Sequence, residues 1–202
     1  MADKKIYSHY ANPIRIGQYI NKFAAFTETK RPYTRLTFSD EYYSARRWLT
    51  KEFKSLGLHC HIDSGGSLIG QRPAGSQFTA PQKVIIGSHI DTVPSGGRFD
   101  GVAGVITAME VIHYLNEHSI ELPFKLEVAD FLGEELNVWG TSCLDSRHMA
   151  GLLGGETLKR RDDRGCILGH EVATCGGTEK APSGARSDAS NILACFELHI
   201  EQ

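Results

Sequence analysis

The stretch KVIIGSHIDTVPSGGRFDGVAGV, residues 83–105, decides the fold class. It opens with a short apolar run typical of a buried strand, and past Asp100 it continues with the apolar spacing of a helix. Between the two lies a turn with a proline and two adjacent glycines. The chain places His89 and Asp91 at the end of the strand and Asp100 before the helix, a pattern that suggests a bound ligand.

Strands and helices alternate on both sides of this stretch. The patterns predict helices over 13–26, 40–55, 101–118 and 141–151, a hairpin over 58–71, and strands over 83–89, 124–131 and 191–200. Residues 154–191 are rich in Gly, Arg, Asp and Ser and show weak periodicity. The alternation predicts an α/β fold with a central, mostly parallel but mixed sheet flanked by helices on both faces.

Composition excludes several classes of function. With 41% hydrophobic residues, 23% charged residues and a formal charge of -2, the chain has the balance of an ordinary globular protein. This balance argues against a nucleic-acid or membrane partner. No window approaches the roughly 18 apolar residues of a spanning helix, and the N-terminus lacks the apolar core of a signal peptide, which favours a cytoplasmic protein. The five cysteines include no C-x-x-C pair, which argues against a disulfide framework or a Cys-rich zinc site.

Imidazole and carboxylate side chains follow three of the predicted strands at their carboxyl ends, the edge where open α/β sheets bind ligands. These residues are His89, Asp100, Glu134, Glu135 and His199. Singly, each is compatible with a structural histidine or a solvated charge, but their recurrence at strand ends favours a metal site. Histidines and carboxylates without a thiolate suit Zn, Mn, Co or Ni, and a carboxylate can bridge two ions about 3.5–4 Å apart.

Four motifs stand in order along the chain: GSHIDTVPSGGRFDGVAGV, GEE after VADF, TSCLDSR and ELHIEQ. With YTRLTFSDEYYSARRWLTKEFKSLGL they make nearly the whole chain resemble the N-carbamoyl-L-amino-acid hydrolase and allantoate amidohydrolase group, the hydantoinase/carbamoylase family of the M20 metallopeptidase superfamily. The resemblance implies a zinc-aminopeptidase-like catalytic domain. It also implies two divalent metal ions, a small carbamoyl or ureido substrate and a homodimeric full-length enzyme.

The same resemblance implies a role for each residue of the strand ends. His89 and His199 are expected to bind one ion and Glu135 the other. Asp100 is expected to bridge the two ions, and Glu134 to act as the general base.

Three further expectations concern the surroundings of these residues. Asp91 is positioned to accept the second imidazole N–H of His89 and so to fix its tautomer. Gln202, at the end of ELHIEQ, is a candidate substrate-binding residue. In similar enzymes the peptide after the bridging aspartate is cis, which predicts a cis bond between Asp100 and Gly101.

The chain departs from the group in two respects. The usual Glu-Glu-Gly-x-Arg-Phe-Gly is here EELNVWG, so Val138 replaces an arginine, which puts the substrate preference in doubt. Related enzymes are longer and contain an inserted dimerisation or lid domain and a C-terminal return segment with a last metal-binding histidine. We therefore expect residues 1–202 to be the N-terminal part of an incomplete dimetal catalytic domain. Alone it is expected to bind the second ion weakly, to turn over little and to expose an open sheet edge with apolar surface.

The leading hypothesis for function is metal-dependent hydrolysis of the carbamoyl C–N bond of an N-carbamoyl amino acid. A closely related alternative is an amidohydrolase for allantoate or another ureido acid. A second alternative is a dipeptidase or aminopeptidase of the wider superfamily. The third is a non-catalytic remnant that binds metal or a partner without turnover.

Overall fold

The helices and strands of the structure follow the order predicted from the sequence. The computed structural model describes residues 11–79, 82–183 and 189–200. Its helices are α1 (Pro13–Ala24), α2 (Asp40–Ser55), α3 (Val102–Glu117), α4 (Leu144–Met149), α5 (Gly155–Leu158) and α6 (Leu168–Thr174), with the 3-10 helix η1 (Ala189–Asn191). The strands are β1 (His59–Ile62), β2 (Leu68–Arg72), β3 (Lys83–Ser88), β4 (Lys125–Asp130) and β5 (Ile192–Glu197). The weakly periodic stretch 154–191 thus contains short helices that the sequence did not predict.

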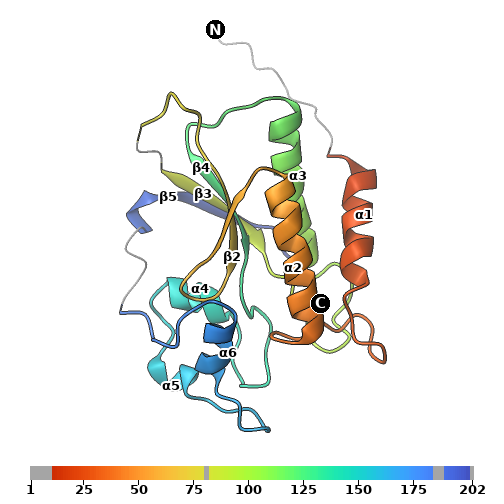
Figure 1. Ribbon diagram of the computed structural model, residues 1–202, viewed down its shortest axis with the longest axis vertical. Helices are drawn as coiled ribbons and strands as arrows, with labels where there is room; N and C mark the ends of the chain where they lie inside the picture. The colour runs from red at the N-terminus through yellow and green to blue at the C-terminus, as the bar shows by residue number, and fades with distance from the viewer. Residues whose placement is uncertain (1–10, 80–81, 184–188, 201–202) are drawn as a thin grey trace.

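The strands form one mixed sheet in the order β1-β2-β4-β3-β5 (Figure 1). β3 is parallel to β4 and to β5, whereas β2 is antiparallel to β1 and to β4. The helix α3 joins β3 to β4, as expected of parallel neighbours, which need a crossover connection. The prediction of an α/β fold with a mixed sheet is therefore confirmed, although parallel and antiparallel pairings are equally represented rather than mostly parallel.

The long helices cover one face of this sheet. α2 packs on β1 and β2, α3 packs on β3 and β4, and α1 lies outside them against α3 (Figure 1). The buried residues of α2 recur at helical spacing and form one stripe, which is the pattern of a helix on a sheet: Tyr42, Ala45, Leu49 and Phe53. On the second face, a smaller cluster of Ile69, Ile85 and Ala129 is contacted by Met149 of α4. Helices therefore flank the sheet as predicted, but the long ones share a face.

Residues at the helix ends explain where the helices begin and end. Ser39 caps α2, because its hydroxyl accepts a hydrogen bond from the backbone N–H of Tyr42 at 3.1 Å. Asn12 caps α1 in the same way, accepting from the backbone N–H groups of Ile14 and Arg15. Gly57 follows α2 with φ +81°, a left-handed conformation in which glycine is the least strained residue.

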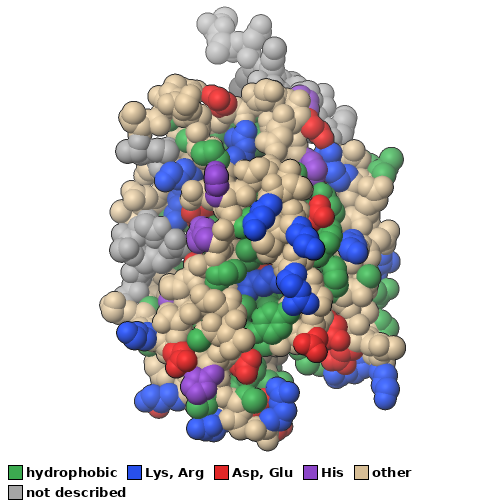
Figure 2. All heavy atoms as spheres, viewed as in Figure 1, with side chains coloured by type: hydrophobic (Ala, Val, Ile, Leu, Met, Phe, Trp, Pro, Cys, Tyr) green, Lys and Arg blue, Asp and Glu red, His purple; other side chains and the backbone are tan. Residues whose placement is uncertain are grey.

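β5 forms an edge of the sheet within the described residues. Leu193 and Phe196 of this strand and Leu198 just after it are exposed, and a groove of about 430 Å³ runs between the strand and α3. An open edge with apolar surface was predicted from the sequence. Elsewhere the surface is mixed, since basic and acidic side chains both spread over the face seen in Figure 2. No helix in the described ranges combines the length and the apolar character needed to cross a membrane.

Candidate metal centre

The candidate ligands lie where three parallel strands end. His89 directly follows β3, Glu134 lies in the loop after β4, and His199 stands two residues beyond β5. Because β3 pairs in parallel with both neighbours, the carboxyl ends of the three strands meet at one edge of the sheet. The sequence prediction that these side chains converge is therefore confirmed for this trio.

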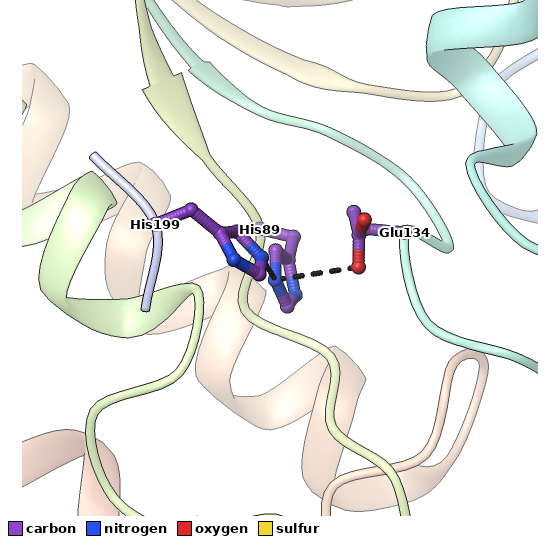
Figure 3. A group of neighbouring side chains, drawn as sticks. All are labelled: His89, Glu134 and His199. Carbon is purple, nitrogen blue, oxygen red and sulfur yellow. Dashed lines mark hydrogen bonds and ion pairs between the residues drawn. The ribbon is translucent and has the colours of Figure 1, made fainter. Parts of the chain in front are cut away.

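The two histidine rings face each other across a short gap (Figure 3). Their Nε2 atoms are 3.1 Å apart, and the rings are stacked with centroids 5.3 Å apart. Glu134 points toward the same place, with its Oε2 3.5 Å from His89 Nε2 (Figure 3). One ligand atom from each of His89, Glu134 and His199 lies within 4.8 Å of the others, a spacing that one metal ion can bridge.

Asp100 adds a fourth donor. Its Oδ1 is 3.6 Å from His199 Nε2 and 4.0 Å from His89 Nε2, and the residue is buried. The carboxylate can approach because Gly101 follows it: a Cβ on Gly101 would lie 2.5 Å from a ring carbon of His89. The structure thus places Asp100 beside both histidines, as the sequence predicted.

The peptide bond after Asp100 differs from the expectation. Within the described residues a cis peptide occurs between Pro32 and Tyr33 and not between Asp100 and Gly101, so the predicted cis bond is wrong. Gly101 instead adopts φ +61° and ψ -49°, which turns the chain into α3 without a cis bond. The assignment of Asp100 now depends on its distances to the two imidazoles alone.

Asp91 supports His89 from the side away from the convergence point. His89 Nδ1 is 3.0 Å from the backbone oxygen of Asp91 and 3.5 Å from its carboxylate Oδ1. A partner on Nδ1 holds the proton there and leaves Nε2 free to bind a metal. The prediction that Asp91 faces the second nitrogen is confirmed, and the backbone oxygen is the nearer acceptor.

The electrostatics of the centre favour a positive charge. Burial by itself lowers the pKa of His89, but the hydrogen bond and charge of Asp91, with the charges of Glu134 and Asp100, outweigh it and raise this pKa to about 9. A pocket of carboxylates that stabilises an imidazolium also stabilises a divalent cation in its place. The centre therefore has the potential that a metal site requires.

Of the two adjacent glutamates, Glu134 belongs to the group of possible ligands with His89 and His199. Glu135 is half-buried, and its backbone N–H donates to Asp91 Oδ2 at 3.1 Å. The sequence had assigned Glu135 as ligand and Glu134 as base, whereas the possible ligand group here contains Glu134. Cys143 contacts Glu134 as well, since its thiol donates to Oε1 at 3.6 Å. Burial and the neighbouring Glu134 charge raise the pKa of that thiol.

Several buried polar residues behind the centre were missed by the sequence interpretation. Arg46 of α2 lies 3.2 Å from Asp130 at the end of β4, and both residues are buried. Burial raises the pKa of Asp130 to about 6, although the Arg46 charge opposes this shift. Thr37 and Arg35 contact the turn that carries His89 and Asp91. A signal was available for Asp130, which directly follows Val128 and Ala129 at the end of a predicted strand, whereas Arg35 lies in a segment of mixed polarity. The candidate Gln202 lies outside the described residues.

The donor set fits a divalent metal ion. Two nitrogen ligands of one tetrahedral zinc ion, each about 2.05 Å from it, lie roughly 3.3 Å apart. The observed Nε2–Nε2 distance of 3.1 Å is close to that value. The residues that could hold such an ion are His89, His199, Asp100 and Glu134.

Comparison with known proteins identifies the family. The model of peptidase family M28 matches residues 67–175, which is more than half of the chain and includes four of the five candidate residues. The chain belongs to peptidase family M28. The motifs had suggested the M20 superfamily, whereas the family model that matches is that of M28. The resemblance to the hydantoinase/carbamoylase group, predicted from the same motifs, is confirmed by the relatives described below.

This M28 chain resembles curated enzymes and solved structures of the predicted group. It is 36% identical over 172 residues to the N-carbamoyl-L-amino acid amidohydrolase of Geobacillus stearothermophilus, covering 84% of this chain and 41% of that one. It is 35% identical over 172 residues to the allantoate amidohydrolase of Bacillus subtilis, covering 84% and 40%. A hydantoinase/carbamoylase family amidase of Burkholderia vietnamiensis superposes with a TM-score of 0.82 at 32% identity, covering 95% and 45%. The chain therefore spans less than half the length of these relatives.

Proposed function

We propose that this chain supplies metal ligands and a general base to an amidohydrolase that cleaves the carbamoyl C–N bond of an N-carbamoyl amino acid. The observation that supports this proposal most is the approach of His89 and His199, whose Nε2 atoms lie 3.1 Å apart beside Asp100 and Glu134. The relatives named N-carbamoyl-L-amino acid amidohydrolase supply the substrate class. The proposed site takes a divalent ion such as Zn, Mn, Co or Ni.

In this proposal each side chain has a defined task. A divalent ion, when bound, acts as a Lewis acid and brings the pKa of a coordinated water near neutrality. Asp91 keeps the proton of His89 on Nδ1, so that Nε2 offers its lone pair. Asp100 supplies a buried carboxylate opposite both rings. Glu134 has a side chain that is 29% exposed, so it can reach both the buried donors and a substrate entering from solvent.

The reaction that we propose adds water across the carbamoyl group. Glu134 takes a proton from the attacking water as its oxygen bonds to the carbamoyl carbon. The C–N bond to the amino acid then breaks, and Glu134 returns the proton to the leaving nitrogen. The other product, carbamic acid, then breaks its remaining C–N bond and gives ammonia and carbon dioxide, so that one water is consumed for each free amino acid released.

The wider assignments also remain proposals. We propose a second ion bound by Asp100 and Glu135, and a homodimer for the full enzyme. We also propose that residues 1–202 act as the N-terminal part of the catalytic domain. On this proposal the chain alone binds one ion well, binds a second weakly and turns over little. The match covers 41% of the Geobacillus stearothermophilus relative, and we propose that the rest of the catalytic machinery of such an enzyme lies in the part that the match does not cover.

Two alternatives have support of their own. The Bacillus subtilis relative is an allantoate amidohydrolase, so the substrate could be another ureido acid on which the same attack occurs. The family model is named for peptidases, so a peptide bond is the other candidate. A metal-binding protein without turnover is the remaining hypothesis.

A chimera tests these proposals. Residues 1–202 would be joined to the unmatched C-terminal part of the Geobacillus stearothermophilus relative and loaded with Mn or Zn. We expect release of ammonia from N-carbamoyl amino acids to exceed release from allantoate, with no cleavage of dipeptides. The Glu134→Gln chimera should lose this activity and keep its metal. Preference for dipeptides, or equal activity of the variant, would contradict the proposal.

A further inference from the structure

A segment far away in sequence contacts the turn that carries His89 and Asp91. The backbone N–H of Arg35 donates to Thr92 Oγ1 at 2.8 Å, and the backbone N–H of Thr92 donates to the oxygen of Arg35 at 3.0 Å. The Arg35 side chain donates from Nε to the backbone oxygen of Ile90. Residues 35 and 92 are 57 positions apart, so this contact is purely tertiary.

Thr37 continues the same contact to the carboxylate of Asp91. Its hydroxyl donates to Asp91 Oδ2 at 2.9 Å, and the backbone N–H of Glu135 donates to the same oxygen at 3.1 Å. Asp91 is fully buried, so its orientation is set by these partners rather than by water. With Oδ2 held by two donors, Oδ1 is left toward His89 Nδ1 at 3.5 Å.

The Arg35 side chain connects this turn to the end of α1. The residue is 2% exposed, and its Nη1 donates to the backbone oxygens of Phe23 and Phe26 at 3.2 and 3.0 Å. The guanidinium therefore links the end of α1 to the Ile90 carbonyl beside His89. A planar group with five donors in fixed directions can hold several carbonyls in one geometry, which a flexible lysine cannot.

We infer that Thr37 and Arg35 are positioning residues of the metal centre: Thr37 sets the orientation of Asp91, and Arg35 sets the backbone that presents His89. This inference rests on the proposed function, because it assigns both residues to the support of a metal ligand. Neither residue touches the convergence point itself. Outer partners of metal-binding histidines fix the ring and its tautomer, and their loss typically lowers metal affinity.

The discriminating substitution is Thr37→Val, which removes the hydroxyl and keeps the shape. Thr37→Ser retains the hydroxyl and should restore the wild-type behaviour. The matched control is Thr50→Val, because the Thr50 hydroxyl donates to the Arg46 backbone oxygen within α2, away from the centre. Arg35→Lys tests the second proposed positioning residue. It retains the charge and loses the fork of donors.

Two measurements separate this inference from the proposed function. In the metal-free protein, long-range ¹H–¹⁵N NMR recorded above pH 10, where the His89 ring is neutral, reports its tautomer, and the Glu135 amide shift at neutral pH reports its bond to Asp91. We expect Thr37→Val to move both signals, and Thr37→Ser and Thr50→Val to leave them in place. In titrations with Zn or Mn, at a temperature at which the variant is fully folded, we expect Thr37→Val to weaken binding roughly 10- to 100-fold.

The outcomes have distinct meanings. Wild-type NMR signals and metal affinity in Thr37→Val would overturn the positioning role. If instead the wild-type chain bound neither metal while Thr37→Val still altered His89, the proposed function would fail and the positioning of His89 would stand. If Thr37→Val does not fold, Arg35→Lys is compared with the wild type by the same two readouts, and wild-type values there would overturn the role of Arg35.

Discussion

The backbone N–H of Glu135 donates a hydrogen bond to the carboxylate of Asp91 across 3.1 Å. This bond ties the loop after β4 to the turn after β3, and each of those segments carries a candidate ligand. Asp91 is buried and also faces His89 Nδ1. One carboxylate thus links the backbone of Glu135 to the imidazole of His89.

Asp91→Asn is expected to lower the pKa of His89, because it removes the nearest negative charge from the ring. In the metal-free wild type this pKa is raised to about 9. A histidine whose pKa is raised by folding increases the free energy of unfolding by up to about 3 kcal/mol. This contribution is complete below pH 6.5, the pKa in the unfolded chain, and is lost as the pH rises through 9. NMR titration of His89 and urea unfolding between pH 6 and 10 measure both effects. An unchanged pKa in the variant would contradict the role of Asp91.

Two amide variants, Glu134→Gln and Glu135→Gln, should show which glutamate is the general base and which is a metal ligand. If Glu134 is the base, its amide variant binds Zn or Mn within a few-fold of wild type, while turnover in the chimera falls by about 10²-fold or more. If Glu135 is a ligand of a second ion, its amide variant loses part of the metal stoichiometry. Calorimetric titration and ammonia release distinguish the two. Loss of the first ion in Glu134→Gln would make Glu134 a ligand, as its 3.5 Å approach to His89 permits.

Gly101→Ala is expected to disturb the centre more than a matched glycine variant. A methyl group there meets the His89 ring at 2.5 Å, in a backbone with φ +61°. Gly97 is also left-handed, at φ +94°, but has open space around it. We expect Gly97→Ala to cost about 1 kcal/mol of backbone strain and Gly101→Ala to cost roughly 2–4 kcal/mol and to weaken metal binding. Equal urea midpoints for the two variants would show that the close approach to His89 is unimportant.

Asp130 should make the protein less stable as the pH rises from 4 to 6. Its folded pKa is raised from 3.8 to about 6 by burial, so the folded state holds a proton that the unfolded chain has already lost. The free energy of unfolding therefore falls as the pH rises from 3.8 through 6. In Asp130→Asn nothing titrates at this position, and this part of the pH dependence should disappear from unfolding curves. Persistence of the same slope would assign it to another group.

Much of the candidate site could be predicted from the sequence, because strand ends are local features. Apolar runs locate β3 and β4, and the residues that follow a parallel strand must lie at a common edge. His89, Asp100 and His199 were placed together on that ground, and their Nε2 and Oδ1 atoms lie within 4.0 Å. Their convergence needed no knowledge of any distant contact.

Other features could not be predicted in this way. Because Glu134 and Glu135 are adjacent, their side chains are expected to point in different directions. Which of them faces His89 depends on the conformation of the loop after β4, which the sequence does not reveal. The peptide after Asp100 was expected to be cis, yet the positive φ of Gly101 directs the chain into α3 instead. Helices were expected on both faces, as found, but periodicity identifies only the apolar side of a helix and could not predict that the long helices share one face of the sheet.

The sequence by itself therefore determined the order of the strands and long helices, the gathering of imidazoles and carboxylates at the strand ends and the relationship to amidohydrolases, because periodicity and motif spacing are properties of neighbouring residues. Only the tertiary structure decided that residues 33–37 contact the turn after β3, where Thr37 binds Asp91 and Arg35 binds the Ile90 carbonyl. A buried hydroxyl or guanidinium takes whichever partner the packed chain brings to it. That partner is set by the fold and leaves no periodic signal in the sequence.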